Sequence, residues 1–104
     1  MKKYQIKIDP EALSDIRDIA EWYDTQKAGL SKRFQNTVIK QIDYLVENPQ
    51  LFSIRYQEIR CMIVRKFPYM VHFYINEELT TVNILAVIST DRNPLVWKEK
   101  TSRI

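Results

Sequence analysis

The residues of this chain best suited to bind a phosphate or a carboxylate are four basic side chains in its second half: Arg60, Arg65, Lys66 and Arg92. Guanidinium groups make paired, charge-assisted hydrogen bonds to such anions. Residues 55–104 hold eight Lys/Arg and five Asp/Glu, whereas residues 1–54 hold eight of each, so the net charge of +3 belongs to the second half. This surplus fits a nucleic-acid or acidic-peptide partner, and an ordinary solvated rim explains it about as well.

The only histidine, His72, is the candidate general base, because imidazole exchanges protons near neutral pH. In an extended strand it shares one face with Met70 and Tyr74. No carboxylate stands at a fixed spacing that would orient the ring. A structural or surface histidine is therefore the simpler interpretation.

The only cysteine, Cys61, lies beside Met62 and Ile63 and has no second cysteine or histidine close to it in the sequence. Neither a thiolate nucleophile nor a metal site is expected from such neighbours, and Cys61 is predicted to belong to the core. The sequence also lacks a glycine-rich phosphate loop, a nucleotide-binding motif and a nucleophilic triad. No cofactor and no metal are expected.

One short strand and two helices are expected in the first half of the chain. Residues 4–8 alternate apolar and polar side chains, as a half-buried strand does. Asp9 then provides an N-cap and Pro10 a favourable first helical residue, and apolar residues at three- and four-residue steps predict a helix that ends near Gln26.

A second helix is expected after Gly29, the only glycine, which suits a tight connection, and Ser31 would cap it. The helix should stop at Asn48-Pro49, because a residue before proline avoids helical geometry. Its apolar residues lie on one face: Phe34, Val38, Ile42 and Leu45. Packing of the two apolar stripes predicts an antiparallel helical hairpin.

The second half of the chain is rich in β-branched and aromatic residues, which predict three antiparallel strands over residues 60–67, 69–75 and 81–88. In the middle strand, one alternating set should face the helical hairpin and the other an open face. The first set is Val71, Phe73 and Ile75, and the second is Met70, His72 and Tyr74.

Asn93-Pro94 is typical of the cap and first turn of a last short helix, which carries Leu95 and Trp97. The predicted order is β-α-α-β-β-β-α. This order indicates an α+β fold in which a two-helix hairpin packs on a small antiparallel sheet, with a short C-terminal helix.

A single domain is expected over residues 1–104, because two separate cores would each be too small to offset chain entropy. The lone cysteine and the lack of a charged and then apolar leader favour a reducing, cytoplasmic setting. No uncharged stretch approaches the roughly 18 apolar residues of a membrane span, so no membrane partner is expected.

Short motifs follow one another along the whole chain in a specific order: Ile8-x-Pro10-x-Ala12, Asp15-Ile16-x-x-Ile19, Tyr23, Phe34, Leu45-x-x-Asn48-Pro49, Ile59-Arg60, Phe67-Pro68-Tyr69 and Arg92-x-Pro94-x-x-Trp97. Each is common alone, but their order and spacing together resemble the RelE/ParE superfamily of toxins from type II toxin–antitoxin systems. Plasmid stabilisation proteins belong to this superfamily.

The resemblance implies a bacterial toxin that inhibits growth and is neutralised by a small cognate antitoxin. RelE-like members cut messenger RNA in the ribosome, and ParE-like members poison DNA gyrase, so the fold alone leaves both targets open. The residues expected to bind a partner include aromatic anchors. They are Arg60, Tyr69, His72, Tyr74 and Trp97.

The sequence departs from the ribonuclease pattern at two places. RelE-like nucleases carry an arginine after the tyrosine that opens the middle strand, where this chain has Met70. Their basic residue just past the last strand falls here at Ser89 or Thr90. Loss of one transition-state donor typically costs about 10²-fold or more in rate. The gyrase-poison interpretation is therefore preferred.

Two alternatives stay open. A metal-independent, ribosome-dependent endoribonuclease would use the four basic candidates, Arg60, Arg65, Lys66 and Arg92, with Arg92 in the vacant position after the last strand. The other alternative is an inactive binding module that keeps the same fold.

Overall fold

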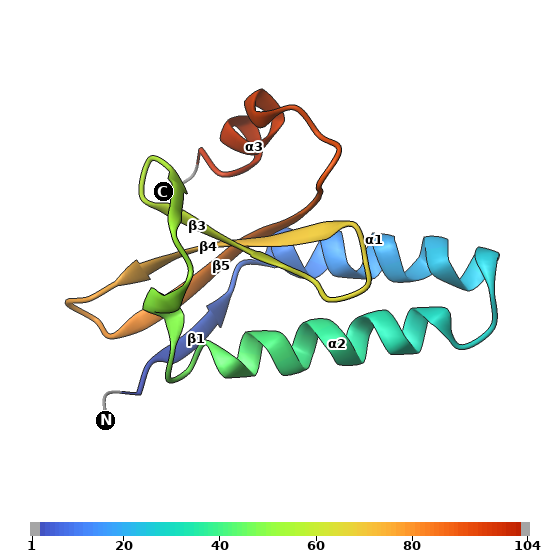
Figure 1. The fold of residues 1–104 in the computed structure, drawn as a ribbon, viewed down its shortest axis with the longest axis horizontal. Coiled ribbons are helices and arrows are strands. Elements are labelled where there is room, and N and C mark those ends of the chain that lie inside the picture. The colour runs from blue at the N-terminus through green and yellow to red at the C-terminus, as the bar shows by residue number, and fades with distance from the viewer. Residues whose placement is uncertain (1–2, 103–104) are drawn as a thin grey trace.

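The computed structural model describes residues 3–102, and the first two and last two residues of the predicted domain lie outside this range. Figure 1 shows the arrangement of its helices and strands. In chain order the elements are β1 (Gln5–Ile8), α1 (Pro10–Gln26), α2 (Leu30–Tyr44), the 3₁₀ helix η1 (Pro49–Leu51), β2 (Ile54–Tyr56), β3 (Ile59–Ile63), β4 (Tyr69–Asn76), β5 (Thr81–Ser89) and α3 (Pro94–Lys100).

Helix α1 begins and ends where the sequence predicts. The backbone of Asp9 is extended, and its carboxylate accepts the N–H of Glu11 at 3.2 Å, with Pro10 in the first turn. These contacts satisfy one of the N–H groups that a helix start leaves without a partner. The helix ends at Gln26.

Helix α2 differs from the prediction at both ends. Gly29 is its N-cap with a φ of 84°, a left-handed conformation that glycine adopts without strain. Ser31 is therefore not the cap; it is buried inside the first turn, where its hydroxyl accepts from Gln35 Nε2 at 3.1 Å. The α-helix ends at Tyr44, before Asn48-Pro49, because the chain passes through turns in which the Asn48 N–H donates to Tyr44 O at 3.3 Å.

The five strands form one sheet in the order β1-β5-β4-β3-β2. Strands β3, β4 and β5 are antiparallel neighbours, as predicted, and β2 adds to β3 in antiparallel fashion. Strand β1 runs parallel to β5, with Gln5 opposite Thr81 and Ile8 opposite Ile84. The sheet is therefore mixed. Strand β2 was not predicted, because three residues are too few to display an alternating pattern.

Strand β3 is shorter than the predicted 60–67, because the chain turns back after Ile63. The N–H of Val64 donates to Tyr69 O at 2.9 Å, and the N–H of Phe67 donates to Val64 O at 3.1 Å. Lys66 has a φ of 69°, which no extended strand accommodates. Residues 64–68 are thus the turn between β3 and β4.

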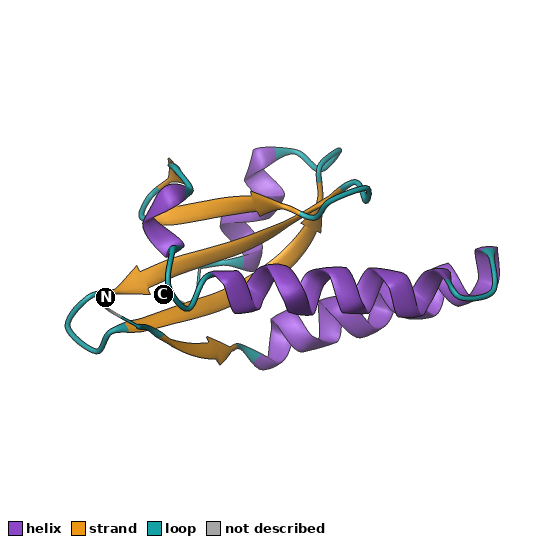
Figure 2. Cartoon of the chain, turned by 60° about the horizontal axis from the view of Figure 1, so that its bottom comes forward, coloured by secondary structure: helices purple, strands orange, loops and turns teal. Residues whose placement is uncertain are grey.

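Helices α1 and α2 cover one face of the sheet, and the end of the hairpin that carries their connection projects beyond it (Figures 1 and 2). Val71 and Phe73 are fully buried there and Ile75 is partly buried, which confirms the predicted direction of this set. The rings of Phe34 and Phe67 meet edge to face with their centroids 5.2 Å apart. This apolar layer is the main core.

The opposite face was predicted to be open, and this prediction is wrong. Helix α3 returns across it, and Trp97 packs on Cys61, Met70 and Ile88 in a second, smaller cluster. His72 is fully buried beneath the same helix. A seven-residue helix can close the face because its one large aromatic side chain fills the space above the strands.

Within residues 3–102, no helix is both long enough and apolar enough to cross a lipid bilayer.

Candidate functional site

A cleft of about 350 Å³ lies where α1, the end of β5 and the segment carrying α3 meet. We call it the sheet-end cleft. Its lining comes from three parts of the chain that are far apart in sequence: Asp15, Asp18, Ile19 and Trp22 of α1, Tyr69 and residues 87–89 of β4 and β5, and Arg92, Val96 and Lys100. Two residues singled out from the sequence, Tyr69 and Arg92, are therefore brought together here.

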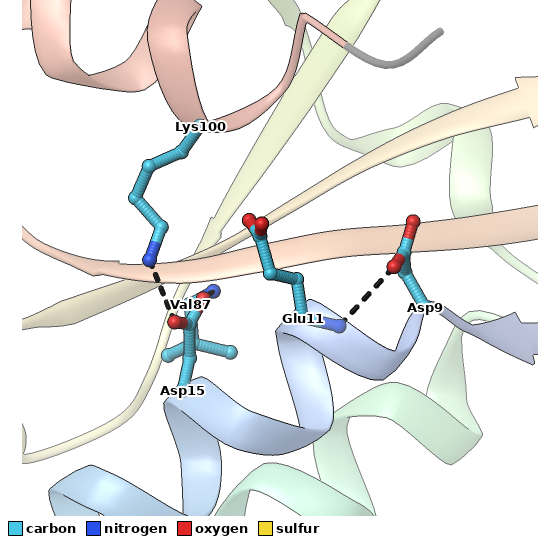
Figure 3. A network of polar contacts seen from close by, with 5 residues as sticks. All are labelled: Asp9, Glu11, Asp15, Val87 and Lys100. Atoms are coloured by element: carbon cyan, nitrogen blue, oxygen red, sulfur yellow. Dashed lines mark hydrogen bonds and ion pairs between the residues drawn. The ribbon is translucent and has the colours of Figure 1, made fainter.

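Asp15 joins the three walls of this cleft (Figure 3). One carboxylate oxygen lies 2.6 Å from Lys100 Nζ, and the other accepts the N–H of Val87 at 3.0 Å. The Asp15 side chain is only 12% exposed, so its charge requires these partners. The carboxylate thereby fixes α1 to β5 and α3 to both.

The mouth of the cleft combines an aromatic ring with a cation. Trp22 is 52% exposed, and Arg92 is exposed on the loop between β5 and α3. Asp15 and Asp18 balance Arg92 and Lys100 in formal charge, so the cleft is not strongly electropositive. Such a lining can hold a polar or weakly anionic group beside an indole.

The other two basic candidates at this end are Arg65 and Lys66, in the exposed turn between β3 and β4. The N–H of Thr90 donates to Pro68 O at 3.0 Å, which holds this turn against the loop that carries Arg92. Arg65, Lys66 and Arg92 therefore lie at the same end of the sheet.

Arg60 does not belong to that patch. It lies further along β3, opposite Phe73, and its Nη1 donates to Phe52 O at 2.7 Å and to Gln50 O at 3.4 Å. These carbonyls belong to the 3₁₀ helix η1 and the residue after it. The geometry gives Arg60 a structural role, because its guanidinium satisfies backbone acceptors that the chain leaves open.

Tyr74 is also apart from the sheet-end cleft. It lies opposite Asn83 and lines a separate hollow of about 230 Å³ with Lys7, Asp9 and Pro10. Tyr69 and Tyr74 therefore cannot contribute to one compact site.

The interior beneath α3 contains a chain of polar groups that connects β4, β2 and α3. His72 Nδ1 lies 2.9 Å from the Tyr56 hydroxyl, which lies 3.1 Å from Thr101 Oγ1. Thr101 donates its proton to Trp97 O at 2.7 Å. Thr101 must then accept from Tyr56, and Tyr56 must accept from a protonated Nδ1 of His72. Every hydrogen bond in this series is therefore donated in the same direction, from β4 towards α3.

His72 and Cys61 are neighbours in space, with Cys61 Sγ 3.4 Å from His72 Nδ1, a contact that the sequence did not reveal. Burial, with further contributions from Arg55 and Lys100, lowers the pKa of His72 to about 4, and burial raises the pKa of the Cys61 thiol to about 11. Both groups are neutral at pH 7. They form a packed, uncharged pair and not a thiolate nucleophile.

The predicted partner-binding roles of His72 and Trp97 are therefore not supported by their positions, since both are buried. Trp97 is packed among the rings of Tyr56 and His72, with centroids at 5.8 and 5.2 Å. Its indole N–H is the one buried side-chain polar atom without a hydrogen-bond partner in the described part of the chain. The interpretation of His72 as a structural histidine agrees with this position.

The sequence did not indicate Asp15, Trp22 and Lys100 as site residues. Asp15, Ile19 and Trp22 stand at helical spacings of four and three residues, so a shared face of α1 was a usable signal. No comparable signal linked Lys100 to Asp15, 85 positions away. Across residues 3–102, no three His, Cys, Asp or Glu side chains lie close enough together to hold a metal ion.

The family model described as "ParE toxin of type II toxin-antitoxin system, parDE" matches residues 6–94. The chain belongs to the ParE toxin family. This membership agrees with the resemblance seen in the sequence motifs and makes the protein a ParE-like toxin of a type II toxin–antitoxin system. No curated protein matches the chain at a significant level.

Solved structures support the fold. The chain is similar to a protein of the chromosomal ParDE toxin–antitoxin system of P. aeruginosa, with a TM-score of 0.69 and 16% identity over 86% of this chain and 98% of that one. A mutant of the E. coli toxin RelE in the free state gives a TM-score of 0.69 and 16% identity over 98% of both chains. A chain of the intact E. coli RelBE toxin–antitoxin complex gives 0.60 and 21% over 86% and 99%.

Proposed function

We propose that this ParE-like toxin acts on DNA gyrase by binding it and does not cut RNA. The observation that carries the proposal is the absence of positive charge where the resemblance places the catalytic groups of the nucleases. Met70 is buried in the cluster beneath α3, and Ser89 and Thr90 at the end of β5 carry no charge. A transition state with an extra negative charge would meet no cationic side chain at either place.

The remaining proton-transfer candidates support the same proposal. His72 is fully buried and neutral, so it cannot reach a substrate while α3 covers the sheet. The charges around the sheet-end cleft balance each other, whereas an RNA-cleaving site needs a surplus of cations. Recognition of a protein surface requires no such surplus, and the exposed Trp22 is a suitable anchor for it.

We further propose that a small antitoxin neutralises the toxin in the cytoplasm, where gyrase and ribosomes operate. The RelE and RelB proteins of E. coli form a complex of this kind. On this chain, a groove of about 480 Å³ runs between α1 and α2 on the outer side of the hairpin, with the exposed apolar side chains of Leu13 and Ile39 along it. An amphipathic helix of the antitoxin would bury these residues.

The test uses the purified toxin in two reactions: gyrase with supercoiled DNA, and translating ribosomes with a reporter messenger. Inhibited supercoiling or trapped cleaved DNA, with intact messenger, is the expected result. Site-specific messenger cleavage without an effect on gyrase would overturn the proposal. Harmless expression without any antitoxin, together with no effect in either reaction, would instead identify an inactive binding module.

An endoribonuclease is the second candidate, and one observation favours it. Tyr69, Arg92 and Lys100 line the same cleft, so a hydroxyl and two cations are available at the end of the sheet. Replacement of Arg92 with Ala discriminates between the candidates. A nuclease should lose messenger cleavage and still bind its antitoxin, whereas a gyrase poison should leave the messenger intact with or without Arg92.

A further inference from the structure

The side of the helical hairpin that faces away from the sheet is covered by no element of residues 3–102 (Figures 1 and 2). The groove of about 480 Å³ between α1 and α2 lies on this side, and we call it the hairpin groove. Two apolar side chains in it are largely exposed, Leu13 at 48% and Ile39 at 62%. Covering them with a partner would remove apolar surface from water.

The charges beside the hairpin groove differ in sign between its two walls. Near the connection of the helices, α1 contributes the carboxylates of Glu21 and Asp24, and α2 carries Lys32 on its exposed side. None of these three side chains belongs to an ion pair within residues 3–102. A surface with one acidic and one basic half is complementary to a second copy of itself.

Charged and apolar residues follow the same order on both helices. On α1, Leu13 stands about three turns before Asp24, and on α2, Ile39 stands about two turns after Lys32. Residues that are whole turns apart lie on the same side of a helix. Because the two helices are antiparallel, both charged residues lie near the connection and both apolar residues lie towards the other end of the hairpin.

We propose that the free toxin forms a two-fold symmetric dimer through the hairpin groove, with the symmetry axis along the hairpin. Helix α1 of each chain then packs on α2 of the other, with both connections at the same end. Asp24 meets Lys32 of the partner subunit, and Leu13 meets Ile39 of the partner subunit. Each contact occurs twice, because a two-fold interface uses the same patch on both chains.

The direction of the axis follows from the remaining side chains. Arg17 is the one cation that α1 contributes to the groove, and along this axis it lies within about one turn of Asp43 of the partner subunit. An axis across the helices would instead pack α1 on α1 and set Leu13 against Asp24 of the partner subunit. That contact would desolvate a carboxylate without giving it a partner.

The size of the hairpin face sets the strength of the dimer. Helices of this length and spacing form a face of about 25 by 20 Å, or about 500 Å² per chain. A standard stable interface buries about 800 Å² per partner, so a dissociation constant in the micromolar range is expected. The antitoxin helix proposed above would compete for the same groove and separate the dimer. The dimer itself depends on neither the gyrase proposal nor the antitoxin proposal.

Sedimentation equilibrium of the purified toxin, free of antitoxin, tests the dimer. Over concentrations from about 1 to about 200 µM, the apparent mass should rise from 12.5 kDa towards twice that value. A mass that stays at 12.5 kDa throughout overturns the proposal and leaves the hairpin groove to an antitoxin helix.

A charge exchange tests the arrangement of the two chains. Asp24→Lys and Lys32→Asp should each weaken the dimer by about tenfold or more, because each sets like charges opposite one another. The double variant restores opposite charges and should bind within about threefold of the unmodified chain. Weakening by Lys32→Asp cannot come from overall repulsion, since this change brings the net charge of +3 closer to zero.

The matched controls make the same charge changes elsewhere on the surface. They are Glu78→Lys in the β4–β5 turn and Lys98→Asp on α3, both at exposed positions away from the hairpin groove. Both should dimerise as the unmodified toxin does. With unchanged circular dichroism, a dimer that neither single variant weakens, controls that weaken it equally, or a double variant that fails to restore it would each overturn the proposal.

Discussion

The two faces of the sheet are covered in different ways. On the hairpin face, two long helices bury a continuous apolar layer in which Phe34, Phe67 and Tyr69 pack edge to face. On the α3 face, a single seven-residue helix covers a small cluster that contains a neutral histidine and an indole N–H without a partner. The hairpin face carries the main hydrophobic core, whereas the other face carries a small cluster that α3 covers.

This difference indicates that the two faces contribute unequally to stability. Apolar area on the hairpin face is large and free of unpaired polar groups, so it supplies most of the hydrophobic stabilisation. The α3 cover depends on Trp97, on one hydrogen-bond chain and on the Asp15–Lys100 pair. Segments held by few contacts open at a lower free energy than the core. The sheet-end cleft lies beside this weaker face.

Phe34→Ala, on the hairpin face, is expected to lower the free energy of unfolding more than any other substitution considered. Phe34 is fully buried among three aromatic rings, so its loss should lower the free energy of unfolding by about 4 kcal/mol through a lost transfer term and a cavity. Urea denaturation followed by circular dichroism measures it. Phe34→Leu, which retains most of the volume, should cost much less. A loss from Phe34→Ala no greater than that of the leucine variant would mean that this face is not the core.

Trp97→Ala should lower the free energy of unfolding less than Phe34→Ala does, and it should loosen α3 more than the rest of the molecule. We expect a loss of about 2 kcal/mol, below the range typical of a buried aromatic, because α3 can detach while the sheet and hairpin persist. Amides of α3 should lose their protection from hydrogen exchange, and those of β4 and β5 should keep theirs. Loss of protection in every strand at once would show that the two faces are a single cooperative unit.

Acid should destabilise the α3 face through His72. The pKa of His72 is lowered from 6.5 to about 4 by burial first, and then by Arg55 and Lys100. Below about pH 6.5 the unfolded chain binds a proton that the folded chain does not. The free energy of unfolding should therefore fall as the pH decreases from 6.5 towards 4, by about 1.4 kcal/mol per pH unit.

The measurement compares urea denaturation at pH 7 and pH 5 for the unmodified chain and for His72→Gln, which does not titrate. Carboxylates affect both chains alike, so the difference between the two pH dependences isolates the histidine and should reach about 2 kcal/mol. Identical pH dependences would mean that His72 is not buried in the neutral form.

Asp15→Asn should lower the free energy of unfolding least among these variants. The amide oxygen can still accept the N–H of Val87, but the ion pair with Lys100 is lost, so about 1 kcal/mol is expected. Lys100→Met removes the same pair from the other side. A double-mutant cycle should show that the two losses are not additive. Additive losses would show that the contact between them contributes nothing.

The parts of the fold that follow local rules could be predicted from the sequence. The Asp9-Pro10 start of α1, the Asn93 cap of α3 and the alternating faces of β4 were each confirmed. Their causes lie within a few residues of the chain, where capping, proline geometry and strand alternation act.

The parts that depend on distant contacts could not be predicted. The parallel pairing of β1 with β5 has no local signature, and the burial of His72 follows from Trp97, which the chain brings back across the sheet. Among the basic candidates, Arg65, Lys66 and Arg92 lie at one end of the sheet, but Arg65 and Arg92 line different hollows. Arg60 lies elsewhere, because its guanidinium donates to carbonyls of a 3₁₀ helix and of the residue after it, and the sequence pattern gave no sign of that helix.

The bond between Asp15 and Val87 spans 72 positions, and β5 lies between β1 and β4 in the sheet. A chain that stops before residue 81 lacks β5 and the wall of the sheet-end cleft that β5 provides, which leaves β1 without a partner strand and β4 paired with β3 alone. Nonsense and frameshift alleles anywhere upstream of that codon should thus yield products that proteases remove. In a cell that has lost the antitoxin gene, a chain-terminating mutation at any codon before that of residue 81 should therefore remove the toxicity.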